Sequence, residues 1–161
     1  MTRRAELLAD RIEEGAATLA ALAQGLTTAE WATPVSATDR RTVGQIVNHV
    51  ALMYPIEIDV ARAVAGGNAV TDVTWAGVAE INANHAREHA DVTKEAALER
   101  LRENSYAAAV ATRAFSDEEL DRAAPFSLSY LAPMTAQFVL EDHAVRHAWH
   151  HLHRIKACLG R

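Results

Sequence analysis

The sequence predicts an all-α protein that folds as a four-helix bundle in a single domain, residues 1–161. Three observations support this class. Long segments carry apolar residues at helical spacing, short connections separate these segments, and no useful run alternates apolar and polar residues as a half-buried strand does. Half of the residues are apolar, so a chain of this length can bury a core without disulfides or other covalent staples.

The first two helices are indicated by their periodicity and their start signals. Residues 3–24 place leucine and isoleucine at helical spacing, and a glycine follows as a stop. The second helix is expected over residues 43–65, because Thr42 and Gln45 match a capping box in which each side chain satisfies the other's free backbone N–H. Pro55 lies inside this helix and is expected to kink it or break it locally.

The second half of the chain also reads as helical, with one ambiguous stretch. A third helical region covers residues 76–114 and restarts at Thr93 after a kink. Ser116 opens another capping box and a short turn of helix. The stretch over residues 126–133, FSLSYLAP, fits an extended linker or a short strand, and the pattern does not decide between them. The last helix is expected over residues 134–159.

Composition excludes several classes of function. A net charge of −5 with no basic run argues against a nucleic-acid groove. A single cysteine excludes a disulfide framework and a cysteine-rich zinc module. The longest uncharged stretch, residues 123–140, contains prolines and polar residues, so we expect no membrane span and a cytoplasmic protein. Exposed apolar helix edges leave a homodimer open as the assembly.

Histidine is the unusual residue in this composition: there are eight, and five of them lie between positions 143 and 153. A helical residue turns by about 100° relative to the one before it. On that wheel His151 falls within the apolar arc of the last helix, and His147 falls on its edge one turn earlier. The remaining three in this segment point further round toward solvent: His143, His150 and His153.

A third histidine, His49, lies on the apolar stripe of the second helix. An imidazole ring has two polar nitrogens that need partners, so packing alone does not explain its place there. A metal ion supplies one partner, and a carboxylate or carbonyl supplies the other. Together with His147 and His151, this predicts a metal site between two helices. The alternative, that the three histidines are hydrogen-bonded to protein groups in the core, stays open.

Other candidate sites carry weaker signals. His85 and His89 are also one helical turn apart, but their neighbours are polar, so we expect a solvated face with at most a fortuitous surface metal. Cys158 falls on the apolar side of the last helix and reads as a small, inert core residue. The sequence has no glycine-rich phosphate loop and no serine in a nucleophile elbow.

Two segments carry a resemblance to a known family. TVGQIVNHVAL in the second helix and HAWHHLHRI in the last helix are similar to the DinB-like superfamily of metal-binding bundles. The resemblance implies a DinB/YfiT-like four-helix bundle whose metal ligands are His49, His147 and His151. These are the three histidines that the helical wheel also selects. Asn82 resembles an asparagine found on the third helix of the family.

The resemblance also implies a function, because relatives include mycothiol and bacillithiol S-transferases and a mycothiol-dependent maleylpyruvate isomerase. It implies a metal-dependent thiol S-transferase or thiol-dependent isomerase that acts on a low-molecular-weight thiol and a small electrophile. Zn²⁺ is the first choice of metal, and Ni²⁺ or Mn²⁺ also fits histidine ligands. No catalytic residue is assigned beyond the metal ligands. The alternative is a non-catalytic metal-binding bundle with a role in stress response.

Two departures from the family pattern bear on this expectation. The last helix ends the chain, so we expect no counterpart of the isomerases' C-terminal domain, which argues against that exact activity. Arg146 precedes the first ligand of the last helix, where many relatives carry an acidic residue. The groups that surround and tune the metal ligands are therefore expected to differ.

Overall fold

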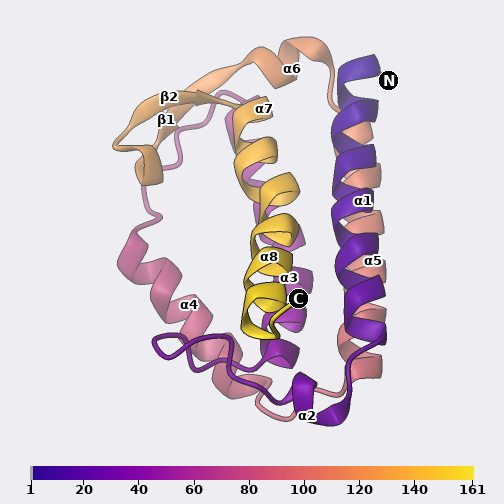
Figure 1. Ribbon diagram of the computed structural model, residues 1–161. Coiled ribbons are helices and arrows are strands. Elements are labelled where there is room, and N and C mark those ends of the chain that lie inside the picture. Colours follow the sequence, from indigo (N-terminus) through magenta and orange to yellow (C-terminus); the bar gives the residue numbers. More distant parts are fainter. Residues whose placement is uncertain (1) are drawn as a thin grey trace.

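Four helical columns pack side by side in the computed structural model, which describes residues 2–161 (Figure 1). Three columns are single helices, α1 (Arg3–Gln24), α3 (Val43–Ala65) and α5 (Lys94–Arg113). The fourth passes through α7 (Ala136–Val139), a π-helical segment (Leu140–Val145) and α8 (Arg146–Cys158). The predicted four-helix bundle is confirmed.

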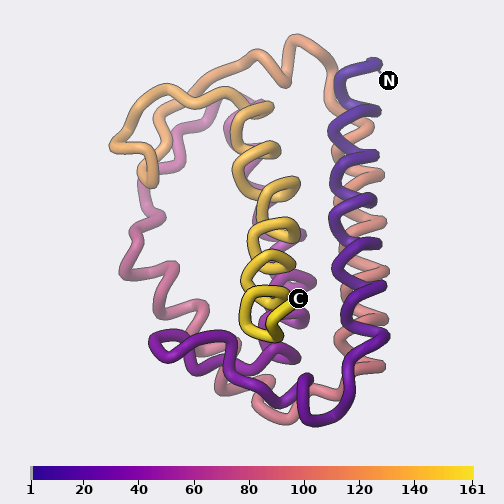
Figure 2. The backbone as a smooth tube through the Cα atoms, viewed as in Figure 1, coloured from indigo at the N-terminus to yellow at the C-terminus, as the bar shows by residue number. Residues whose placement is uncertain are grey.

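Neighbouring columns do not follow the order of the chain. Helix α5 packs against both α1 and α3, and the α7–α8 column packs against the other sides of the same two helices. The order around the bundle is therefore α1, α5, α3, α8. Figure 2 shows the chain starting near one end of the bundle and finishing toward the other. As a result α3 and α8 lie together, although α4, α5 and a hairpin separate them in the sequence.

Local capping explains why the long helices begin where the sequence predicts. The Thr42 side chain accepts from the backbone N–H of Gln45, and the Gln45 side chain accepts from that of Thr42. Thr93 caps α5 in a similar way. Helix α3 continues through Pro55, so the predicted local break is absent. The buried side chains of Tyr54 and Ile58 hold the helix against its neighbours on either side of the proline.

The predicted helical region over residues 76–114 is divided between two packing environments. Helix α4 (Trp75–Glu88) ends at His89, and α5 begins five residues later after a turn. Only α5 joins the bundle, whereas α4 contacts α3 from outside and buries none of its residues fully. Helix α4 therefore stands as a separate wall beside α3 (Figure 1).

The ambiguous stretch forms part of a β-hairpin. Strands β1 (Ala123–Phe126) and β2 (Ala132–Thr135) pair antiparallel around a 3₁₀ turn at Ser127–Ser129. Backbone hydrogen bonds also join Val70, in the loop before α4, to both sides of Phe126. These long-range bonds stabilise a strand that local periodicity does not reveal. They also delay the last helix, which starts at 136 rather than at the predicted 134.

The core is apolar and continuous along the bundle axis. Its largest fully buried aliphatic side chains come from all four columns: Leu8, Ile12, Leu19, Ile46, Val50, Leu101, Leu140 and Ile155. Two short helices, α2 (Thr28–Trp31) and α6 (Asp117–Asp121), close the connections at the ends. Within residues 2–161, no helix has both the length and the apolarity that crossing a bilayer requires.

Candidate metal centre

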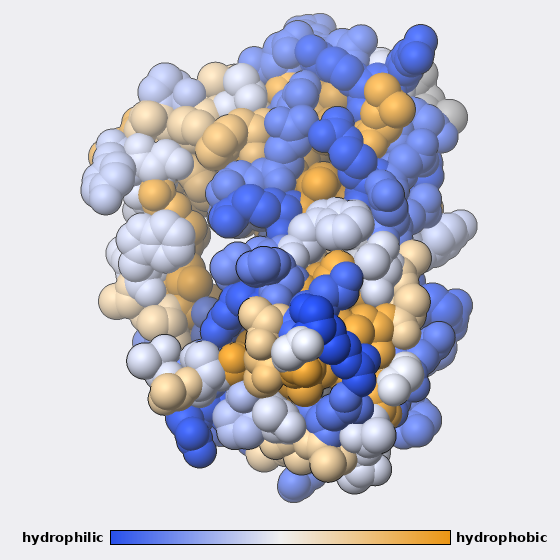
Figure 3. Space-filling view, in the orientation of Figure 1, coloured by the Kyte–Doolittle hydropathy of each residue, from blue (hydrophilic) through white to orange (hydrophobic). Residues whose placement is uncertain are grey.

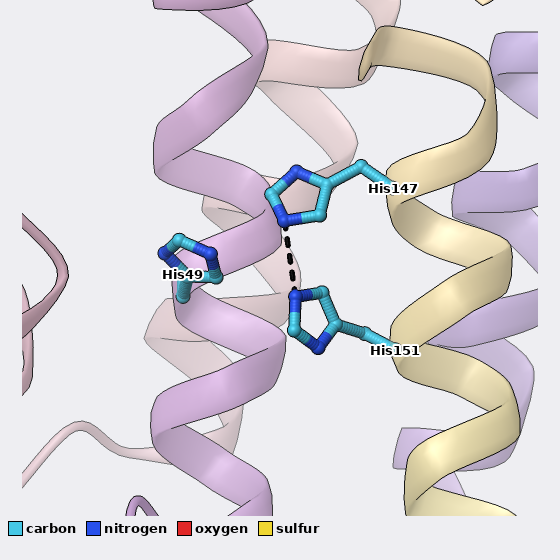
Figure 4. Close-up of side chains that lie close together, drawn as sticks. All are labelled: His49, His147 and His151. Atoms are coloured by element: carbon cyan, nitrogen blue, oxygen red, sulfur yellow. Dashed lines mark hydrogen bonds between the residues drawn. The ribbon is translucent and has the colours of Figure 1, made fainter. Parts of the chain in front are cut away.

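Helices α3 and α8 bring the three histidines selected from the sequence into one cluster. Each of His49, His147 and His151 offers a ring nitrogen, and these three nitrogens lie within 4.8 Å of one another. The Nε2 atoms of His147 and His151 are 3.0 Å apart. Figure 4 shows these two rings projecting from α8 toward α3, which carries His49. His49 and His151 are buried, at 5% and 4% exposure, and His147 is half-buried.

The turn that precedes the cluster is a π-helix. Residues Leu140–Val145 adopt the wider π geometry, and α8 resumes regular α-helical spacing at Arg146. π segments of this kind are rare in helices and are frequent at functional sites. Regular spacing after the π turn places His147 and His151 on one face. A helical wheel with a uniform step of about 100° identifies that pair. It misplaces the residues before Arg146 around the helix axis, because the π turn has more residues per turn.

Burial disfavours the charged form of His49 and His151. Desolvation, reinforced by His147, lowers the pKa of His49 to about 2, and it lowers the pKa of His151 strongly as well. Neutral imidazole is the form that binds a metal ion. The Nδ1 atoms of His49 and His151 are both buried without a hydrogen-bond partner. The cluster is therefore poorly explained as histidines satisfied by protein groups. It fits a divalent metal ion with nitrogen ligands.

A buried carboxylate that the sequence analysis missed stands behind one ligand. Glu57 of α3 is 8% exposed, and its Oε1 lies 2.7 Å from Nδ1 of His147. Carboxylates in this position orient a histidine ligand and raise its basicity. Arg146, at the position where the resemblance led us to expect an acidic residue, pairs with Asp142 at 2.9 Å. The only sequence signal for Glu57 was an acidic residue within the largely apolar run MYPIEIDV.

The cluster lies at the wall of a cleft of about 420 Å³ between α3, α4, α8 and the hairpin. This volume is in the range of small-molecule sites. Figure 3 shows the surface hollowed between α4 and α8, with hydrophilic side chains along the α8 side. Apolar residues of α3, α4 and the hairpin form the opposite wall: Met53, Ile56, Val60, Trp75, Val78, Ile81, Phe126 and Leu128. Asn82 also lines the cleft.

The remaining histidines of the last helix differ in their access to this cleft. His143 lines it, half-buried, with its ring against Phe126 at 5.7 Å between centroids. The Nε2 atom of His143 is buried without a hydrogen-bond partner, and burial lowers the pKa of its ring. His150 lines the cleft from an exposed position, and His153 is exposed outside it. His143 is therefore less exposed than its place on the wheel predicts.

Two weaker predictions need correction. His85 and His89 are half-buried rather than solvated, and their ring centroids are 6.4 Å apart. The Gln45 side chain donates to the carbonyl of Ala86 at 2.7 Å and draws this end of α4 onto α3. Cys158, the last residue of α8, is half-buried rather than a core residue, and its thiol donates to the carbonyl of Pro34. None of these three joins the histidine cluster.

Comparisons with known proteins agree with this fold. The family model described as the DinB superfamily matches residues 11–155. A similar solved structure is that of YfiT from Bacillus subtilis, described as a probable metal-dependent hydrolase with an unusual four-helix bundle topology. The TM-score is 0.77 at 18% identity, over 100% of this chain and 89% of that one. No curated protein matches. Because the family model spans most of its length, the chain belongs to the DinB superfamily.

Proposed function

We propose that the protein is a divalent-metal-dependent enzyme that activates a low-molecular-weight thiol, of the mycothiol or bacillithiol type, toward a small electrophile. One observation carries the proposal: three clustered imidazoles, of which His49 and His151 are buried and held neutral, line a cleft large enough for a small molecule. Zn²⁺ is the proposed ion, with Ni²⁺ and Mn²⁺ as alternatives. The cytoplasmic location expected from the sequence is part of this proposal.

The cleft is the reason to favour an enzyme over a metal-binding bundle without catalysis. Structural metal sites are closed by four protein ligands, whereas catalytic sites have three and leave a position for substrate. Among residues 2–161, no fourth histidine, cysteine, aspartate or glutamate joins the cluster. The cleft reaches the same three histidines, so a small molecule has access to any ion they hold.

The residues around the cluster have separate tasks in the proposed reaction. When bound, a divalent ion supplies positive charge that stabilises a thiolate. Glu57 holds His147 in orientation from behind. The buried Nε2 of His143 has no partner and accepts the proton that leaves the thiol. The sulfur then forms a bond to the electrophilic carbon. In a substitution the bond from this carbon to the leaving group breaks and its electron pair leaves with that group; in an addition the electron pair of the π bond moves to the neighbouring atom.

Hydrolysis is the second candidate function, since the similar structure from Bacillus subtilis is described as a probable metal-dependent hydrolase. The same residues serve this reaction with water in place of the thiol. His143 would accept a proton from water, and the apolar wall would hold an ester or amide. The two functions differ in the nucleophile, so they are separable by experiment.

The test loads the protein with Zn²⁺ and supplies mycothiol, bacillithiol or glutathione with a model electrophile. We expect metal-dependent loss of free thiol with at least one of them. His49→Ala, and His147→Ala with His151→Ala, should abolish both this activity and stoichiometric metal binding in a bundle that stays helical. His153→Ala, an exposed histidine on the same helix, is the matched control and should change neither.

One outcome decides between the candidates, and another tests the site that both of them need. A p-nitrophenyl ester cleaved in a metal-dependent way, with no thiol consumed, would replace thiol transfer by hydrolysis. Metal content unchanged in the histidine variants would refute the site itself. In either reaction His143→Gln should lower the rate about 10²- to 10⁴-fold, the usual contribution of a positioned base, while metal content stays unchanged.

A further inference from the structure

Two arginines at the edge of the cleft share a single carboxylate. Asp39, in the loop before α3, accepts from Nε and Nη2 of Arg41 at 2.9 and 2.7 Å. It also accepts from Nη2 of Arg154 on α8 at 3.0 Å. The hydrogen bond from Arg41 is the main cause that lowers the pKa of Asp39, so this carboxyl stays ionised. The three side chains together carry one net positive charge.

Arg41 has donor capacity that Asp39 does not use. A guanidinium presents five N–H donors, and Asp39 occupies only the edge formed by Nε and Nη2. The Nη1 atom is buried and has no hydrogen-bond partner. Both Arg41 and Arg154 line the cleft together with His49. A charged donor without an acceptor is unfavourable, and an anion that enters the cleft would supply the acceptor once the Arg41 side chain turns Nη1 toward the opening.

The other aspartate, glutamate and arginine residues that line the cleft are Glu57, Asp142 and Arg146. Glu57 contacts His147 at 2.7 Å, and Asp142 pairs with Arg146 at 2.9 Å. Among the charged groups formed by the described residues at the cleft, the Asp39–Arg41–Arg154 group is therefore the one in which arginines outnumber carboxylates. The wall provided by α4 is apolar and includes Trp75, of which 65% is exposed. An occupant that matches both features has an apolar body and one negative group.

We propose that Arg41 and Arg154 form an anion-binding position that takes the carboxylate of a small molecule, whose apolar body lies against α4. The inference rests on the proposed function, because it names a class for the electrophilic substrate of the same cleft. A carboxylate fits better than a phosphate monoester, because the arginine group has one positive charge to offset and a phosphate monoester carries nearly two negative charges. The planar carboxylate also matches the planar edge of a guanidinium.

Calorimetry on the full-length protein as purified tests the proposal, with the metal content measured in every sample. The probes are 3-phenylpropanoate and its neutral counterpart of the same shape, 3-phenylpropanamide. We expect the wild type to prefer the carboxylate by about tenfold or more, as for a charge-assisted hydrogen bond. Arg41→Gln should remove most of this preference with little effect on amide binding. Arg146→Gln, which alters a cleft arginine that has its own partner, should keep the preference.

A second substitution separates anion binding from a structural role, because Arg41 also ties its loop to α8 through Asp39. Asp39→Asn breaks the same ion pairs but leaves the positive charges of both arginines without a carboxylate. The variant should therefore keep or increase the preference for the carboxylate probe over the amide probe. If Arg41 only anchors the loop, both substitutions should weaken binding alike, and that result would overturn the proposal. Equal affinity of the wild type for the two probes would also overturn it. Neither measurement depends on thiol turnover, so a failed transferase assay leaves this inference standing.

Discussion

The half of the bundle built from α1 and α5 and the half built from α3 and α8 bury different chemistry. The buried polar residues of α5 are Ser105 and Thr112, whose hydroxyls donate to carbonyls of their own helix. The other half buries Asn48, which accepts from Arg100 of α5, and three titratable residues, His49, Glu57 and His151. Several of their polar atoms lack hydrogen-bond partners. The α1–α5 half therefore stabilises the fold, whereas the α3–α8 half is destabilised by buried polar atoms that lack hydrogen-bond partners.

The same division is visible at the surface of the two halves. Arg113 of α5 joins three acidic residues of α1 on the outside of the bundle: Glu6, Asp10 and Glu13. The α3–α8 half is instead covered by α4, which packs loosely and leaves the cleft. The scaffold and the site should therefore be separable by mutation: substitutions in the α1–α5 half should change stability, and those in the α3–α8 half should change metal binding.

The largest expected effect is on the scaffold. Leu101 of α5 is 1% exposed. Leu101→Ala leaves a cavity and should lower the free energy of unfolding by about 2–5 kcal/mol. The affinity for Zn²⁺ should stay within about twofold, because the variant leaves the α3–α8 cluster intact. Urea unfolding and a Zn²⁺ titration measure the two quantities. A folded Leu101→Ala protein that has lost its metal stoichiometry would show that the halves are coupled.

The three clustered histidines should behave in the opposite way. Zn²⁺ at about one hundred times its dissociation constant should raise the free energy of unfolding of the wild type by about 2.7 kcal/mol. His151→Leu should abolish this gain. In chelator the same variant should be as stable as the wild type or more stable, because leucine leaves no buried nitrogen unpaired. Thermal unfolding with and without Zn²⁺ checks both statements, with His153→Leu as the control on the exposed face.

Acid should destabilise the metal-free protein through the same histidines. The pKa of His49 is about 2 in the folded state, against 6.5 for the free side chain, and that of His151 is also lowered. The unfolded state therefore binds more protons below about pH 6.5, and stability falls as the pH falls. The slope should be about 1.4 kcal/mol per pH unit for each such histidine. Urea unfolding between pH 7 and pH 5 measures it.

A matched pair of variants assigns that slope. His49→Gln should reduce the slope by up to the contribution of one proton, about 1.4 kcal/mol per pH unit. His153→Gln should leave the slope unchanged, because His153 is exposed. If the slope of His49→Gln equals that of the wild type, the pH dependence arises elsewhere and the α3–α8 half does not bear the cost assigned to it.

The scaffold was predictable from the sequence because local signals determine its elements. The start of α3 follows from the capping box of Thr42 and Gln45, which involves only four successive residues. The hairpin was not predictable, because it depends on contacts between distant segments, and the π turn was not predictable either. Val70 stabilises β1 from more than fifty residues away in the sequence. No local pattern marks the wider turn at 140–145.

The site was predictable in part for the same reason. His147 and His151 share one helix, so their spacing revealed them, and the apolar stripe of α3 revealed His49. Glu57 and Arg41 act through partners on other elements, and neither has a spacing signal that points to its partner. Sequence periodicity identifies side chains that share one face of a helix. Side chains that orient them from another element, as Glu57 does, are identified only from the three-dimensional structure.

The smallest expected effect concerns the surface of the α1–α5 half. Arg113 lies 2.8 Å from both Asp10 and Glu13 and 3.4 Å from Glu6. Arg113→Gln should lower the free energy of unfolding by about 1 kcal/mol, because exposed ion pairs are weak individually and three carboxylates would be left facing one another. The loss should shrink in 1 M NaCl, which screens that repulsion. Urea unfolding at low and high salt measures it, with Arg102→Gln, whose partners lie on its own helix, as the control. A loss as large as that of Leu101→Ala, and insensitive to salt, would mean that the ion cluster rather than the apolar interface joins α1 to α5.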